Sequence, residues 1–81
     1  EFRRVLFRSL LDRLSKGLDR VGNRPVEKFI TTDGYKFLLG DDEWVAFRAS
    51  GTEPLIRCYI EAHSEARLKQ LASACRRILT A

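Results

Sequence analysis

The segment from residue 48 to residue 57, Arg-Ala-Ser-Gly-Thr-Glu-Pro-Leu-Ile-Arg, concentrates the groups that could do chemistry. Gly51 permits unusual backbone angles and lies between Ser50 and Thr52, so backbone N–H groups and two hydroxyls can converge on one small acceptor. Arg48 stands at the entrance, where its planar guanidinium can hold two oxygens of a phosphate at once. The segment therefore suits a phosphate dianion. Because Ser, Gly and Thr are common in turns, a plain hairpin connection is the alternative.

The rest of the chain offers little for catalysis or metal binding. Cys58 and Cys75 are too far apart for a paired metal motif, and each falls on an apolar face, so we interpret both as core thiols. His63 is the only histidine and has no ligand-type neighbour; we interpret it as a loop residue. The acidic run 41–43 is interpreted as a solvated turn, since no partners converge on it. We expect no catalytic residue and no metal site in this chain.

The spacing of apolar residues predicts the elements that position this segment. Three- and four-residue steps predict a helix over residues 10–21, ended by Gly22 and Asn23. Alternation predicts strands over 26–30, 35–39, 43–48 and 55–61, with Trp44 and Phe47 as packing residues. Ser64 is a good N-cap for a final helix. Its apolar stripe consists of Leu68, Leu71, Cys75, Ile78 and Leu79.

These elements predict a two-layer α+β domain in which two amphipathic helices flank a four-stranded antiparallel sheet. With 81 residues, the chain has room for one small core. Residues 1–9 resemble a translated adapter, so we expect a non-native leader there and the domain over residues 10–81.

Composition narrows the class of protein. The net charge is +4, but much of the basic excess lies in the first nine residues, and no run of cations alternates with aromatics. Nucleic acid is therefore not an expected partner. No segment approaches the length of a membrane span, and the cysteine content suits a reducing compartment, so we expect a cytoplasmic protein without a membrane partner.

The pattern Arg-x-Ser-Gly-Thr-Glu-Pro, followed by Arg57, Tyr59, Glu61 and Ala62, resembles the phosphate-binding loop in the C-terminal domain of the phosphohexomutase superfamily. That superfamily includes phosphoglucomutase, phosphomannomutase and the phosphohexosamine mutases. The resemblance extends upstream to residues 32–34 and 44–45, and the helix, four-strand, helix order matches that domain. It therefore covers roughly residues 10–81.

The resemblance implies a C-terminal fragment of a hexose-phosphate mutase, an isomerase that moves a phosphoryl group within a sugar phosphate. Arg48, Ser50, Gly51 and Thr52 would grip the phosphate that is not being transferred. Glu53 and Arg57 would form a supporting ion pair beneath the loop. The partners implied are the sugar phosphate and the remaining domains of the parent enzyme.

The chain departs from the superfamily pattern at one loop position and lacks three of its motifs, which limits the function predicted for the chain alone. Ala49 occupies a position where many members carry Pro, which should loosen the loop slightly without removing a donor. The serine, sugar-reading and magnesium motifs are missing from the 81 residues. The resemblance therefore places the phosphoserine and Mg²⁺ on other domains, and we expect the fragment alone to be inactive. A stand-alone anion- or nucleic-acid-binding module and a purely structural interaction domain are the alternatives.

Overall fold

The chain forms two helices, a short hairpin and a four-stranded sheet. The computed structural model describes residues 2–50 and 55–80, with side chains from residue 8 onward. In chain order the elements are α1 (Phe2–Ser15), β1 (Arg20–Val21), β2 (Arg24–Pro25), β3 (Lys28–Ile30), β4 (Tyr35–Gly40), β5 (Glu43–Ala49), β6 (Ile56–Glu61) and α2 (Glu65–Thr80).

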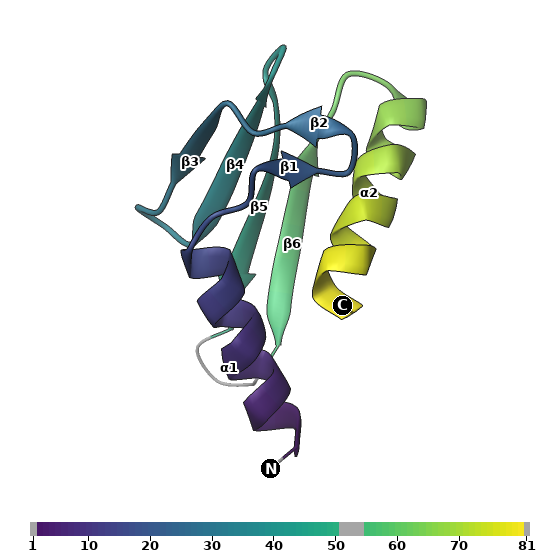
Figure 1. Ribbon diagram of the computed structural model, residues 1–81. Coiled ribbons are helices and arrows are strands. Elements are labelled where there is room, and N and C mark those ends of the chain that lie inside the picture. Colours follow the sequence, from purple (N-terminus) through teal and green to yellow (C-terminus); the bar gives the residue numbers. More distant parts are fainter. Residues whose placement is uncertain (1, 51–54, 81) are drawn as a thin grey trace.

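The main sheet has the order β3-β4-β5-β6, and each neighbouring pair is antiparallel. In Figure 1, α1, the β1–β2 hairpin and α2 lie in front of this sheet, so one face is covered and the other is open. This arrangement confirms the predicted α+β class with two helices and four antiparallel strands. It also means that alternate residues of each strand face either the core or the open side.

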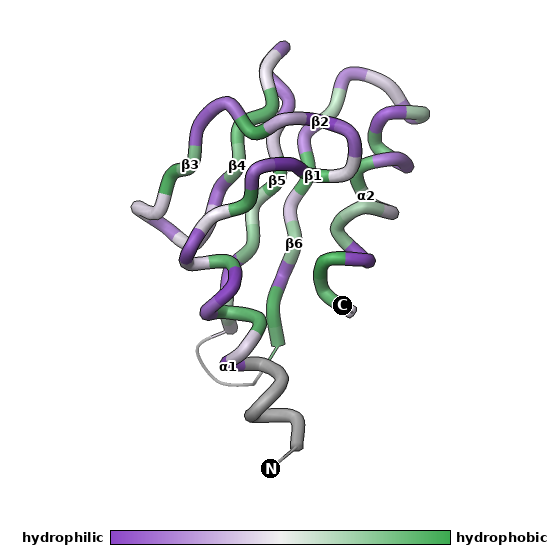
Figure 2. Tube along the Cα trace, viewed as in Figure 1, coloured by the Kyte–Doolittle hydropathy of each residue, from purple (hydrophilic) through white to green (hydrophobic). Residues whose placement is uncertain are grey.

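The core lies between the covered face of the sheet and the two helices. Its buried residues include Phe37 and Leu39 from β4, Val45 and Phe47 from β5, and Leu14 from α1. Phe47 is therefore a packing residue as predicted, whereas Trp44 faces the open side of the sheet. Figure 2 shows the same alternation of hydrophilic and hydrophobic residues along β6.

The final helix begins as the sequence predicts. The backbone N–H of Arg67 donates to the Ser64 hydroxyl at 3.2 Å, which is the bond expected of an N-cap. Leu71, Ala74 and Cys75 are buried on α2. The predicted stripe is wrong at Leu68, which is 42% exposed.

The first helix is shorter at its C-terminal end than predicted. It ends at Ser15, and Gly17 follows with φ +85° and donates its N–H to the Leu14 carbonyl at 3.0 Å. A glycine in the left-handed region just past the last turn is a common helix stop. Val21, predicted to lie on the helix, is instead buried in the β1–β2 hairpin that was not predicted.

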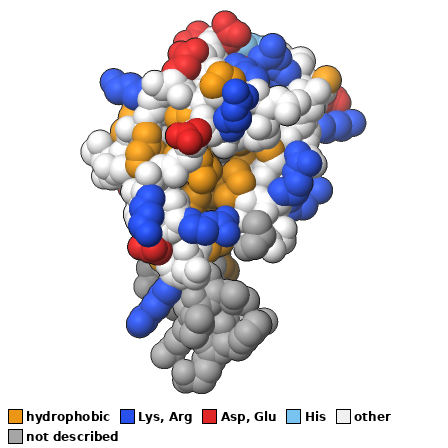
Figure 3. All heavy atoms as spheres, viewed as in Figure 1, with side chains coloured by type: hydrophobic (Ala, Val, Ile, Leu, Met, Phe, Trp, Pro, Cys, Tyr) orange, Lys and Arg blue, Asp and Glu red, His pale blue; other side chains and the backbone are white. Residues whose placement is uncertain are grey.

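The two helices are linked across the covered face. The Nη2 group of Arg13 in α1 donates a hydrogen bond to the backbone carbonyl of Ile78 near the end of α2, at 2.9 Å. Figure 3 shows apolar side chains in the middle of this face, bordered by Lys and Arg. Among the described residues, no helix is long and apolar enough to cross a membrane.

Candidate functional site

Arg48 lies near the end of β5, on the open side of the sheet. Its neighbour Phe47 is fully buried, so alternation directs the Arg48 side chain away from the core, and that side chain is 54% exposed. A guanidinium held at a strand end, with most of its donors in solvent, can reach an incoming anion without a rearrangement of the core. The structure therefore places Arg48 where the sequence predicted it, at the entrance of the loop.

A backbone hydrogen bond joins the two residues that flank positions 51–54. Ser50 donates its N–H to the Leu55 carbonyl at 2.9 Å, which brings together the two residues on either side of positions 51–54. The predicted phosphate ligands Gly51 and Thr52, and the predicted supporting residue Glu53, lie outside the described residues. The structure thus shows that Ser50 and Leu55, which flank residues 51–54, are hydrogen-bonded to each other.

Arg57 lies directly opposite Arg48. The two residues are cross-strand partners in the β5–β6 ladder, and both are exposed. Directly opposed residues of an antiparallel pair point to the same face, and like charges there repel. A bound anion would offset that repulsion. The predicted ion pair between Arg57 and Glu53 stays a prediction, because Glu53 is not described.

The turn between β3 and β4 lies against the end of β5 that carries Arg48. A side-chain oxygen of Asp33 lies 3.6 Å from Arg48 Nη2, and the Asp33 side chain is 77% exposed. Gly34 has φ +91°, and a Cβ built there would lie 2.6 Å from the Phe47 carbonyl oxygen and 2.9 Å from Arg48 Cγ. Only glycine fits this position, so the turn can pack directly against the strand that carries Arg48.

The open face next to Arg48 is hollowed. A depression of about 300 Å³ is bordered by Arg48 and Asp33 together with Trp44, Lys36 and Tyr59. The Lys36 ammonium lies 4.2 Å from the centre of the Trp44 ring, a cation–π distance. The aromatic rings are thus part of an exposed, cationic surface continuous with Arg48. The sequence interpretation of Trp44 as a packing residue did not anticipate this surface.

A buried carboxylate was missed by the sequence interpretation. Glu43, assigned to a solvated turn, is 1% exposed. Its Oε2 accepts the N–H of His63 at 3.0 Å, and its Oε1 accepts from Arg24 and from Arg67, the latter at 2.6 Å. The hydrogen bond from His63 and those from the two arginines lower the pKa of Glu43 to about 2, although burial acts in the opposite direction.

Asp41 and Asp42 do form a turn, as the sequence suggested. Both have positive φ, 54° and 61°, and they connect the paired residues Gly40 and Glu43 as a two-residue hairpin loop. The Asp41 carbonyl oxygen is hydrogen-bonded to Nε2 of the His63 ring, so His63 is part of the packing around this turn. The described residues contain no group of three or more His, Cys, Asp or Glu placed to hold a metal ion.

The two cysteines face each other between β6 and α2. Cys75 is buried and Cys58 is half-buried against the core, in line with their predicted role. A hydrogen bond with Cys58, together with burial, raises the pKa of Cys75, while the same bond lowers the pKa of Cys58. Cys75 therefore stays a neutral thiol.

Comparison with known proteins identifies relatives of the chain. The family profile described as phosphoglucomutase/phosphomannomutase, C-terminal domain, matches residues 6–78. A phosphoglucomutase/phosphomannomutase of Thermococcus kodakarensis is 54% identical over 43 residues, which cover 53% of this chain and 9% of that protein. A probable phosphoglucosamine mutase of Pyrococcus horikoshii is 47% identical over 45 residues, covering 56% of this chain and 10% of that protein.

A more divergent relative covers more of the chain. A phosphopentomutase of Thermococcus kodakarensis is 34% identical over 59 residues, which cover 73% of this chain and 13% of that protein. No solved structure gives a significant match. The matched part thus amounts to about a tenth of the length of each of these relatives.

Proposed function

The chain belongs to the phosphoglucomutase/phosphomannomutase C-terminal domain family, and we propose that it binds the phosphate of a sugar phosphate through the loop that follows Arg48. The phosphate in question is the one that is not being transferred. Held there, it would support intramolecular phosphoryl transfer, such as the conversion of glucose 1-phosphate to glucose 6-phosphate.

The observation that carries the proposal is the opposition of Arg48 and Arg57 at the neck of the loop. Two exposed arginines directly opposed in an antiparallel pair share one face of the sheet, and an anion bound between them would offset their like charges. Each guanidinium offers a planar fork of donors that matches two oxygens of a phosphate. A dianion at this place would therefore be favoured by both charge and geometry.

The role in a complete mutase follows from the size of the chain. The matched segments cover only 9% and 10% of the first two relatives, and the other domains would supply the phosphoserine, the Mg²⁺ and the groups that read the sugar. No donor set for a metal occurs among the described residues, so we assign no step through a metal to this domain. Its contribution would be to hold one end of the substrate while the other end reacts. The same grip must serve both orientations of a bisphosphorylated intermediate.

The proposal is tested by titrating the 81-residue chain with glucose 1-phosphate and following backbone amide signals. We expect saturable shifts at Arg48 and Ser50, with millimolar affinity, because one phosphate at an open site gains only about 4 kcal/mol. Arg48→Ala should abolish these shifts. Arg76→Ala is the matched control, since it removes an exposed arginine from α2 without touching the loop.

Two outcomes would overturn the proposal. Shifts confined to other parts of the chain would mean that the loop does not bind phosphate. Duplex DNA that binds far better than glucose 1-phosphate at physiological salt would instead favour a nucleic-acid-binding module.

In a complete parent mutase, Arg48→Lys should lower kcat/KM by about ten- to a hundredfold although the charge is kept, because a mobile ammonium replaces a two-pronged donor. Steady-state kinetics would check this. Equal kcat/KM for wild type, Arg48→Lys and Arg48→Ala would show that Arg48 is only a surface residue at the end of a strand.

A further inference from the structure

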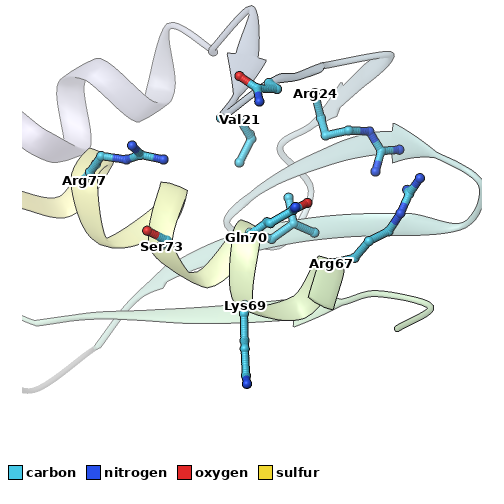
Figure 4. Close-up of a pocket in the computed structure, with 10 residues that line it drawn as sticks. Val21, Arg24, Arg67, Lys69, Gln70, Ser73 and Arg77 are labelled. Atoms are coloured by element: carbon cyan, nitrogen blue, oxygen red, sulfur yellow. The ribbon is translucent and has the colours of Figure 1, made fainter. Parts of the chain in front are cut away.

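A second cationic hollow lies away from the Arg48 loop, between the β1–β2 hairpin and α2. It has a volume of about 390 Å³ and is lined by residues of both elements. Figure 4 shows Arg24 and Arg67 pointing toward each other on one side of it, and Arg77 reaching in from the other side. Three arginines line the hollow and none of its lining residues is acidic, so it is electropositive; Lys69, the fourth lining cation, points away from the other labelled side chains in Figure 4.

Two of these arginines are fixed in place by Glu43. Its Oε1 accepts hydrogen bonds from Arg24 and Arg67, and Arg24 Nη2 also donates to the Leu39 carbonyl at 2.8 Å. An exposed arginine normally loses side-chain entropy when it binds a ligand, and arginines that are already held lose less. One carboxylate also neutralises only one of the two charges, so this cluster keeps a net positive charge.

The fixed arginines retain donors for a ligand. Each guanidinium carries five N–H groups. Toward the described residues, Arg24 uses two in these hydrogen bonds and Arg67 uses one. The side chains of Arg67 and Arg24 are 44% and 25% exposed, so solvent and solutes can reach them. The pair is therefore arranged as a donor surface as well as an anchor for Glu43.

The remaining walls of the hollow are mainly polar. Asn23, Gln70 and Ser73 supply amide and hydroxyl groups, while Val21 and Leu71 border the hollow but are almost completely buried. The hairpin is pressed onto the helix, since a Cβ at Gly22 would lie 3.1 Å from the Ala74 Cβ. Walls held this closely keep the hollow formed before a ligand arrives.

From these features we infer that the hollow is a binding site for a small phosphorylated molecule, distinct from the loop after Arg48. Arginine forks match the oxygens of a phosphate, and this accounts for the charge. The volume exceeds that of a phosphate group alone, so the hollow has room for an organic body beside the arginines. Its hydroxyls meet the amides and the hydroxyl of the wall.

The test is a titration of the full 81-residue chain with glucose 6-phosphate and with citrate at constant ionic strength, followed by amide NMR. Glucose 6-phosphate should give saturable shifts at Asn23, Gln70 and Ser73 at millimolar concentration. Arg77→Gln should weaken this binding about tenfold, near the lower end for one charge-assisted hydrogen bond. These amides are read separately from those of Arg48 and Ser50, so failure of one site does not imply failure of the other.

Arg76→Gln is the matched control, because it removes the same charge from the next residue of α2, which does not line the hollow. It should change the affinity by less than about twofold, since an exposed charge that makes no direct contact with the ligand is weakened by water and salt. Equal weakening by Arg76→Gln and Arg77→Gln would show general attraction to a positive helix and overturn the inference. So would an absence of shifts at the three amides up to about 20 mM ligand, or tighter binding of citrate than of glucose 6-phosphate.

Discussion

Replacement of Gly34 by alanine should loosen the attachment of the β3–β4 turn to the strand that carries Arg48. At φ +91° an L-residue is strained, which costs about 1–2 kcal/mol. The new Cβ would also lie 2.6 Å from the Phe47 carbonyl oxygen, and because that atom is backbone, β5 itself must shift. Overpacking of this kind costs about 1–3 kcal/mol more. Alanine recovers roughly 0.5 kcal/mol by restricting the unfolded chain, so we expect Gly34→Ala to destabilise folding by about 1.5–4.5 kcal/mol.

Gly17→Ala is the matched control for this prediction. Gly17 has a similar φ of +85°, but the nearest atom to its Cβ would be a ring carbon of Phe29 at 3.2 Å. A side chain can move where a backbone carbonyl cannot, so the cost should be that of the backbone angle alone, about 1 kcal/mol.

Urea unfolding of both variants, followed by circular dichroism at low temperature, would measure the two free energies of unfolding. Because Gly34→Ala also crowds Arg48 Cγ at 2.9 Å, it should weaken glucose 1-phosphate binding at the loop, whereas Gly17→Ala should not. If the two variants lose the same stability and bind the ligand equally well, the close packing between the turn and β5 is not what holds Arg48 in place.

Three further predictions concern charges and thiols. The pKa of Glu43 is lowered from 4.5 to about 2, so its stabilising contribution is complete above pH 4.5 and disappears as the pH falls toward 2. Thermal unfolding measured from pH 7 to pH 2 should show this loss of stability. Glu43→Gln should flatten the dependence of stability on pH over that range. Asp33→Asn removes a partly competing acid beside Arg48 and should tighten phosphate binding by up to about threefold, since exposed ion pairs are worth little; weaker binding in this variant would mean that Asp33 orients the guanidinium. Iodoacetamide should alkylate Cys58 well before Cys75 in the native chain, and mass spectrometry showing the reverse order would contradict the assigned pKa directions.

The order of the two helices and the four strands of the main sheet, and the position of Arg48, could be predicted from the sequence because they depend on local periodicity. Alternation over two residues separates Phe47 from Arg48 across the plane of the sheet, and the structure keeps that separation. The cap at Ser64 is likewise a local interaction, made with a residue three positions away. Such features are decided within one or two turns of chain, so a single sequence suffices to predict them.

Burial of Glu43 was decided by residues far away in the chain. Arg24 precedes it by 19 positions and Arg67 follows it by 24, and only the folded sheet and helix bring these cations to one carboxylate. The local signal existed, since Glu43 continues the core-facing alternation of Val45 and Phe47. A carboxylate in a core is too costly to expect without visible partners, so the sequence pattern favoured a solvated turn.

Tertiary packing also decided where the first helix stops and what surrounds the two cationic sites. Apolar spacing continues past Gly17, so periodicity extended the helix to Val21, whereas burial of Val21 against α2 favours a separate hairpin. That hairpin places Asn23 and Arg24 beside α2 and creates the second hollow. Local sequence pattern alone was enough to predict which residues near Arg48 would bind a phosphate. The packing of hairpin, sheet and helix decided which other cations share a surface, because such neighbours are set by the closing of the chain on itself.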